Sequence, residues 1–209
     1  MTPTAADVAV HLARIRPEAE LADRLTAAER ERCSRYLRAA DRDRFAGGRA
    51  LLRAALGRDP SDSAVLKTAE GRPYLDPSSG PQPHISLSHS GMWAAVAICP
   101  GTPVGVDVEH LAEVDRRGFE RLVCSPAEAA RLAALTGDEA AAERLRIWTL
   151  KEALLKAAGS GFLTDPRGVD AAEGERAVAM PGVPHARAAV AVAVRGNRIG
   201  TVSMKEIRL

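Results

Sequence analysis

Apolar and polar positions recur along the chain with the periods of helices and of strands, which predicts a mixture of both. A first helix is expected over residues 26–41, because Thr26 and Glu29 have the spacing of a capping box. The stretch DRFAGGRALLRAALG predicts a second helix that ends at Gly57, with Arg49 and Arg53 one turn apart. The chain is therefore expected to start with helices and to continue with strands.

The middle of the chain reads as a loop followed by a hairpin. Residues 76–83 are rich in Pro, Ser and Gly, which is typical of a loop. HISLSHSGMWAAVAI, residues 84–98, then predicts two strands joined by a turn at Ser90–Gly91. The stretch CPGTPVG, residues 99–105, is the expected junction between two lobes.

The second half repeats this mixture of elements. A short strand, VGVDVE, precedes a helix in which Ser125 and Glu128 form a second capping box around Pro126. A long helix is expected over about 138–158, with a stop at Gly159. The tail predicts a closing hairpin that turns at Gly196–Asn197. The sequence therefore predicts an α+β fold with an N-terminal lobe, 1–103, and a C-terminal lobe, 104–209.

Composition narrows the class of protein. The chain is 46% hydrophobic and 27% charged, as in ordinary globular proteins, and its net charge of +2 gives no argument for nucleic-acid binding. The N-terminus has no signal-peptide pattern, and the longest apolar run, WAAVAIC, is too short to span a bilayer. Cys33, Cys99 and Cys124 are odd in number and lack C-x-x-C spacing. This pattern predicts neither a disulfide framework nor a zinc site, and favours a reducing cytoplasm.

Two carboxylates share one face of the strand GVDVE. Strand alternation points Val106 and Val108 to the core, and Asp107 and Glu109 to the opposite face. Neighbouring carboxylates repel each other unless a cation intervenes. A solvent-facing strand edge is the simpler interpretation of this stretch alone.

A third carboxylate falls on an apolar helix stripe. Leu145, Trp148 and Leu155 define the stripe, and Glu152 takes the position where another apolar residue is expected. A Glu–Lys helix pair with Lys156 is the simpler interpretation, but its ~0.3–0.5 kcal/mol would not offset the burial of a charge.

A divalent cation held by Asp107, Glu109 and Glu152 explains all three positions at once. Ligands that are all oxygen suit Mg²⁺, or Mn²⁺ as a substitute, and protein-bound Mg²⁺ usually keeps positions open for phosphate.

Several cations accompany these carboxylates. The chain has 25 arginines but four lysines, and two of the lysines, Lys151 and Lys156, flank Glu152. Ser88 and His89 end a strand, where a hydroxyl, an imidazole and turn amides could cradle phosphate. Further candidates are Arg49 on its helix and Arg72 in the bend GRPYL. Taken singly, each of these residues also fits a solvated surface or a structural hydrogen bond.

Together these stretches resemble the Sfp-type 4′-phosphopantetheinyl transferases. The family pattern G-[IV]-D-[IV]-E, followed by W-[STC]-x-K-E-[AS]-x-x-K, stands here as GVDVE (105–109) and WTLKEALLK (148–156). The upstream stretches GGRALLRAALG, GRPYL and HISLSHSG, and CSPAE between the two motifs, stand in the family order. The resemblance covers roughly residues 30–165.

The resemblance implies two similar lobes related by a pseudo-twofold axis, each a small antiparallel sheet packed on a long helix. Coenzyme A would bind in the cleft between the lobes. By this resemblance, Asp107, Glu109 and Glu152 would ligate Mg²⁺. Lys156 would contact the phosphate that is attacked, and Ser88 and His89 would contact coenzyme A phosphates. Arg49 and Arg72 would lie at the nucleotide end. Arg35 or Arg38 would add a contact to the 3′-phosphate.

The implied reaction moves 4′-phosphopantetheine from coenzyme A to a serine hydroxyl of an acyl or peptidyl carrier protein and releases adenosine 3′,5′-bisphosphate. Glu152 and Lys156 would be the catalytic residues, with Glu152 or a metal-bound water as the base. Polyketide and nonribosomal peptide carriers are the expected partners, and a monomer is the expected state. A Mg²⁺-dependent nucleotide phosphohydrolase and a non-catalytic module that binds coenzyme A or a carrier are the alternatives.

Overall fold

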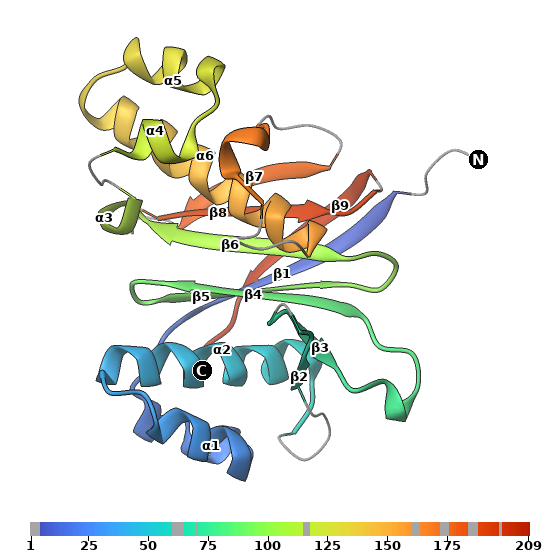
Figure 1. Cartoon of the computed structure of the whole chain (residues 1–209). Coiled ribbons are helices and arrows are strands. Elements are labelled where there is room, and N and C mark those ends of the chain that lie inside the picture. Colours follow the sequence, from blue (N-terminus) through green and yellow to red (C-terminus); the bar gives the residue numbers. More distant parts are fainter. Residues whose placement is uncertain are drawn as a thin grey trace.

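The computed structural model describes residues 5–59, 65–69, 71–114, 118–159, 164–171, 176–183, 188–196 and 198–209. This part of the chain is a mixed α+β structure (Figure 1). The strands are β1 (Ala6–Arg14), β2 (Val65–Lys67), β3 (Pro73–Leu75), β4 (His84–Ser90), β5 (Trp93–Cys99), β6 (Val104–His110), β7 (Ala177–Val183), β8 (Ala188–Val194) and β9 (Ile199–Glu206). The α-helices are α1 (Ala27–Ser34), α2 (Ala39–Leu56), α3 (Leu111–Val114), α4 (Phe119–Val123), α5 (Pro126–Ala133) and α6 (Gly137–Ala158).

The strands form two larger sheets and one small ribbon. The four-stranded sheet has the order β4-β5-β1-β9, and the three-stranded sheet has the order β6-β8-β7. Strands β2 and β3 pair only with each other. The three-stranded sheet is antiparallel, whereas the four-stranded sheet is mixed because β9 lies parallel to β1. The expectation that both sheets are antiparallel is therefore wrong for the four-stranded one.

Two further predictions about the ends of the chain are also wrong. The chain begins with the strand β1, and not with helices. The closing hairpin does not form, because β8 pairs with β6 and β7 while β9 pairs with β1. Residues 188–194 are apolar on both faces and lie at the centre of their sheet, whereas β9 is partly exposed. The lobe boundary at 103/104 stays a prediction.

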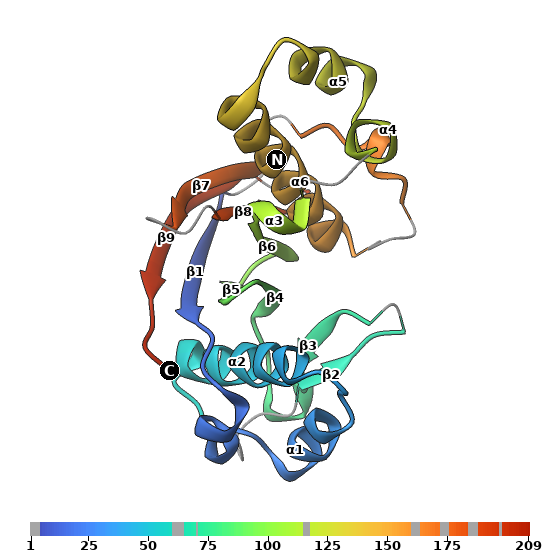
Figure 2. The same cartoon turned by 90° about the vertical axis from the view of Figure 1, so that its left-hand side faces the viewer.

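The core lies between the two sheets and continues under the long helices. One cluster joins alternate residues of β1 and β5 to alternate residues of β6 and β8. Leu51 and Leu52 of α2 cover the outer face of the four-stranded sheet. Ile147 and Leu150 of α6 belong to the cluster on the other side of the three-stranded sheet. Figures 1 and 2 accordingly show α2 and α6 on opposite sides of the strands.

Local signals fix the helix ends as predicted. Both capping boxes form, at Thr26 with Glu29 and at Ser125 with Glu128. The helices α2 and α6 end where Gly57 and Gly159 adopt left-handed backbone, with φ of 62° and 78°. The predicted first helix is shorter than expected, since α1 ends at Ser34 and α2 begins at Ala39.

Gly105 brings α6 unusually close to β6. A Cβ atom at this position would lie 2.0 Å from the carbonyl oxygen of Ala153 and 2.5 Å from the backbone nitrogen of Ala157. The helix backbone therefore rests directly on the strand, and only glycine leaves room for it. The contact places the turn of α6 that carries Glu152 and Lys156 over the strand that carries Asp107.

Cys33, Cys99 and Cys124 are all buried free cysteines. Among the residues that the structure describes, no helix combines the length and the apolar character that crossing a membrane requires.

Candidate active site

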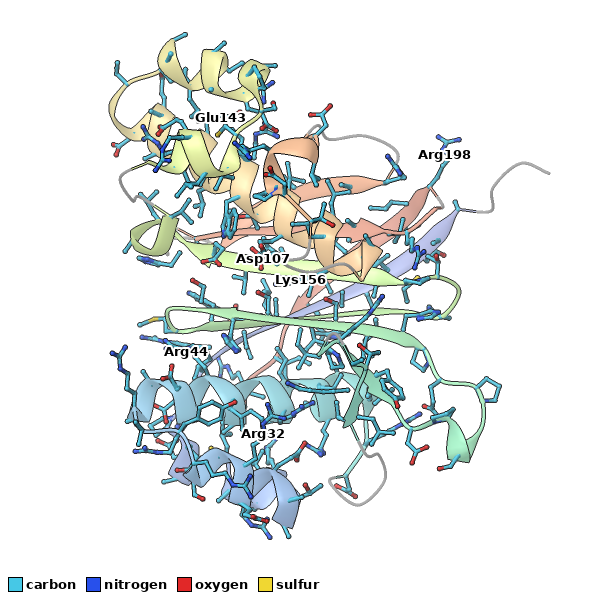
Figure 3. The ribbon with its side chains drawn as sticks, in the orientation of Figure 1. Arg32, Arg44, Asp107, Glu143, Lys156 and Arg198 are labelled. Atoms are coloured by element: carbon cyan, nitrogen blue, oxygen red, sulfur yellow. The ribbon has the colours of Figure 1, made fainter. Side chains whose placement is uncertain are left out.

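The site forms along the β4–β6 seam, where β4 (His84–Ser90) of one sheet runs beside β6 (Val104–His110) of the other. The ammonium group of Lys156 donates to Oδ1 of Asp107 at 2.5 Å and to Oγ of Ser88 at 3.0 Å. Ser88 in turn donates to the same Asp107 oxygen at 2.7 Å. Figure 3 shows Asp107 and Lys156 next to each other, where α6 crosses β6. Residues from three separate motifs thus meet in one hydrogen-bonded group.

Glu109 and Glu152 each lie near a member of this group in the chain, since Glu109 follows Asp107 on β6 and Glu152 is one turn from Lys156 on α6. Glu152 is only 9% exposed, and burial raises its pKa; the negative charge of Asp107 raises it further, against the opposing effect of Lys156. Burial and the charge of Asp107 raise the pKa of Glu109 to about 7. Hydrogen bonds from Ser90, at 2.7 Å, and from the indole of Trp148 counteract this rise. The field of Asp107 therefore acts on both glutamates, as it would in a shared anionic site.

A cavity of about 440 Å³ opens beside Glu109. Its polar wall includes His89 of β4 and Arg44 of α2. Partial loss of solvent lowers the pKa of His89, and the positive charges of Lys156 and Arg44 lower it further. The remaining walls are Ser90, Gly91 and Trp148 together with apolar side chains of α3 and α4, namely Val114, Phe119, Leu122 and Val123. The cavity thus has a polar wall and an apolar wall.

Arg72 lies at the opposite end of the β4–β6 seam. Its guanidinium donates to the carbonyl oxygen of Val104 at 3.2 Å and lies near Gly159 at the end of α6. Burial, with a smaller effect of Arg195, lowers the pKa of Arg72, and the charge of Arg72 contributes to the lowered pKa of His84.

Arg49 is in a different environment from the carboxylates. It is 7% exposed and pairs with Glu29 of α1 at 3.4 Å, a carboxylate that Arg53 also contacts at 2.8 Å. The guanidinium groups of Arg49 and Arg32 both lie 5.5 Å from the centre of the Phe45 ring. Nη1 of Arg49 is buried without a hydrogen-bond partner in the described structure. Arg32, Arg49 and Arg53 thus form a cationic cluster with Glu29. The cluster has more positive than negative charge, and Nη1 of Arg49 is its free donor.

The other lysine of the motif faces away from the carboxylates, as expected from the helix geometry. Lys151 is fully buried and pairs with Glu128 of α5 at 2.6 Å. Its ammonium also donates to the carbonyl oxygens of Val123 and Pro166, both at 2.8 Å. Glu128 accepts from the backbone N–H of Ala171 at 3.0 Å. This buried pair joins α4, α5 and the segment 164–171 to α6.

The chain is similar in sequence to proteins of known family. Residues 103–183 match the 4′-phosphopantetheinyl transferase superfamily. The chain is 32% identical over 165 residues to the 4′-phosphopantetheinyl transferase HetI of Nostoc, an alignment that covers 73% of this chain and 70% of HetI. The chain belongs to the Sfp-type 4′-phosphopantetheinyl transferase family.

Other members of the family align over a shorter share of their length. A 4′-phosphopantetheinyl transferase of Bacillus subtilis is 30% identical over 146 residues, which are 66% of this chain and 62% of that protein. The transferase Sfp of Bacillus subtilis strain 168 is 29% identical over 138 residues, or 64% of this chain and 60% of Sfp. The alignment with these relatives thus spans about three fifths of their length.

The family resemblance raises the question of whether the carboxylates fit a metal ion. Within the described ranges, no group of three or more His, Cys, Asp or Glu side chains is arranged to hold one. The donors themselves suit Mg²⁺ because all are carboxylate oxygens, and Oδ2 of Asp107 is buried with no hydrogen-bond partner among the described residues. An orphaned carboxylate oxygen in a 1% exposed side chain is costly, and a cation would satisfy it.

The sequence did not predict what three residues do at this site. Ser90 and Trp148 hold the Glu109 carboxylate, and Arg44 reaches the cavity from α2. The alternation of serine at positions 86, 88 and 90 was a usable signal, because it places all three side chains on one strand face. Nothing in the sequence distinguishes Arg44 from the other arginines of α2.

Proposed function

We propose that the protein transfers the 4′-phosphopantetheine group of coenzyme A to a serine hydroxyl of an acyl or peptidyl carrier protein. The observation that carries this proposal is the contact of Ser88, Asp107 and Lys156, which come from the three family stretches on β4, β6 and α6. Membership of the transferase family supports it. Polyketide and nonribosomal peptide carriers, a monomeric state and a cytoplasmic location are part of the proposal.

Asp107, Glu109 and Glu152 would hold Mg²⁺, or Mn²⁺ in its place, and the ion would supply positive charge at the diphosphate when bound. The buried, unpartnered Oδ2 of Asp107 and the effect of Asp107 on the pKa of both glutamates support this assignment. Lys156 also pairs with the buried Asp107 carboxylate and neutralises its charge.

The cations divide between the two ends of coenzyme A. Lys156 would contact the phosphate that is attacked, and Ser88 and His89 would contact the diphosphate. Arg72 and the cationic cluster of Arg49 would lie toward the nucleotide, and the free Nη1 donor of Arg49 supports an anion there. The apolar wall formed by α3 and α4 would face the pantetheine arm, which is largely uncharged.

In the reaction, the serine oxygen of the carrier forms a bond to the β-phosphorus while the bond from that phosphorus to the bridging oxygen breaks. The bridging oxygen leaves with adenosine 3′,5′-bisphosphate, and Lys156 stabilises the developing negative charge. Glu152 or a water molecule would accept the serine proton. Catalysis would otherwise consist mainly of positioning and charge neutralisation.

The two halves of the protein would be related by a pseudo-twofold axis that passes near the site. Each half has one long helix, α2 or α6, on the outer side of a sheet, which supports this proposal. The β4–β6 seam would then be the floor of the cleft between the lobes.

The proposal is tested by incubating the protein with coenzyme A, Mg²⁺ and a panel of purified carrier domains, followed by intact-protein mass spectrometry. The mass of a carrier should rise by one phosphopantetheine group, and replacement of its modified serine by alanine should prevent this. Hydrolysis of coenzyme A with no gain on any carrier would instead support a phosphohydrolase, and no reaction would support a binding module. Glu152→Ala should abolish transfer while the circular dichroism spectrum stays unchanged.

A further inference from the structure

The serines of β4 replace a backbone ladder between the two sheets. Ser86, Ser88 and Ser90 all point toward β6, and each is buried. Oγ of Ser86 accepts from the backbone N–H of Val106, and Ser88 contacts Asp107. Strands β4 and β6 belong to different sheets, so these side chains supply the polar contacts of the β4–β6 seam.

Ser90 uses both of its hydrogen-bonding capacities. It donates its only hydroxyl hydrogen to Oε2 of Glu109 at 2.7 Å and accepts from the backbone N–H of His110 at 3.0 Å. The side chain is 5% exposed, and a Cβ atom at the following Gly91 would lie 3.6 Å from the Cβ atom of His110. Rotation of the hydroxyl group away from this position would leave a partly buried N–H without this partner, which favours the observed position.

Glu109 needs such support, because it lines an open cavity. A glutamate side chain has several rotatable bonds, and fixing them costs conformational entropy. Ser90 and Trp148 are the two side-chain donors that lower the pKa of the Glu109 carboxylate, one from β4 and one from α6. These contacts restrain the Glu109 carboxylate from two sides.

We propose that Ser90 is a positioning residue, which restrains the Glu109 carboxylate on the strand face that it shares with Asp107, so that fewer side-chain rotations separate it from Asp107 and Glu152 when a divalent cation binds. This inference rests on the proposed function, because it requires Glu109 to be a metal ligand. Residues that orient a metal ligand typically change metal affinity by about 10–100-fold when they are removed.

Ser86 provides a matched control. Ser86 and Ser90 are each 5% exposed, and each accepts one backbone N–H of β6 at 3.0 Å. Only Ser90 also contacts a carboxylate of the site. A general loosening of the β4–β6 seam would therefore affect Ser86→Ala and Ser90→Ala alike, whereas a positioning role would affect Ser90→Ala alone.

The test is a titration of the full chain with Mn²⁺ at a fixed concentration of coenzyme A, in which the electron paramagnetic resonance signal reports free Mn²⁺ and a chain-free blank is subtracted. Ser90→Ala should weaken Mn²⁺ binding by at least about tenfold, Ser86→Ala should stay within about twofold of the wild type, and Ser90→Thr should restore most of the loss. In carrier modification, the KM for Mn²⁺ should rise in Ser90→Ala with little change in kcat at saturating metal.

Three outcomes would overturn the inference, and they are distinguishable. Equal weakening by both alanine variants would reduce Ser90 to a structural contact. Wild-type affinity in Ser90→Ala, together with weakened binding in Glu109→Gln, would show that Glu109 binds metal without help from Ser90. Wild-type affinity in Glu109→Gln, or no Mn²⁺ binding by the wild type, would remove the proposed metal role of Glu109 and this inference with it.

Discussion

The contact of α6 with β6 at Gly105 leads to a quantitative prediction for Gly105→Ala. The added Cβ would lie 2.0 Å from the carbonyl oxygen of Ala153, whereas ordinary contacts begin at 3.4 Å, a shortfall of 3.4 − 2.0, or about 1.4 Å. Both atoms that it meets are backbone atoms, so no side chain can rotate to relieve the clash. The strand and the helix must therefore move apart.

Overpacking of this kind costs about 1–3 kcal/mol, and occasionally more. For a chain of this size, about 1 kcal/mol lowers Tm by ~2–4 °C, so ~3 kcal/mol would lower Tm by about 6–12 °C. The carboxylates of β6 and α6 would also separate by about 1 Å, and a displacement of that size can lower turnover about 100-fold.

The assay is thermal unfolding followed by circular dichroism, together with the initial rate of carrier modification, and Gly101→Ala is the control. Gly101 has nothing within 4 Å of its added Cβ, and its substitution should change stability by no more than about 0.5 kcal/mol. If Gly105→Ala matched Gly101→Ala in both Tm and rate, α6 would not rest on β6 as described, and the reasoning about the site would fail.

Three further predictions concern single charges. Lys151→Met should lower the free energy of unfolding by about 3–5 kcal/mol in a denaturant titration, because it leaves the buried Glu128 carboxylate without its cation; a loss below about 1 kcal/mol would contradict this. Without metal, the folded protein keeps the Glu109 proton up to pH about 7, whereas the unfolded chain loses it near its ordinary pKa of 4.5. The free energy of unfolding should therefore fall as pH rises between these values. Measured in EDTA, Tm should fall more steeply with pH in the wild type than in Glu109→Gln. Parallel plots of Tm against pH for the two proteins would refute the raised pKa of Glu109. Lys156→Ala should lower kcat more than it raises the KM for coenzyme A, and a change in KM alone would make Lys156 a binding residue.

The local features of the fold could be predicted from the sequence. Capping boxes and helix stops depend on residues within one turn of each other, and those at Thr26, Ser125, Gly57 and Gly159 are confirmed. Long-range pairing could not be predicted in this way. The pairing of β1 with β9 joins distant parts of the chain, and periodicity carries no information about such partners.

The candidate site likewise has local features that the sequence predicts and long-range contacts that it does not. Strand alternation predicted that Asp107 and Glu109 share a face opposite buried valines, and Val106 and Val108 are fully buried. The contact of Ser90 with Glu109 depends on the register between strands of two different sheets, which no short stretch encodes. The environment of Arg49 depends likewise on how α1 docks on α2.

The parallel pairing of β1 with β9 has a consequence for biosynthesis. On the ribosome β1 is made early, but its neighbour on one side, β9, follows only after most of the chain has been translated. Until then one edge of β1 presents unpaired backbone groups, which are a template for pairing with other nascent chains. The yield of native protein should therefore depend on how quickly translation reaches residues 199–206. Deletion of that strand should leave the edge of β1 permanently open to pairing with other chains.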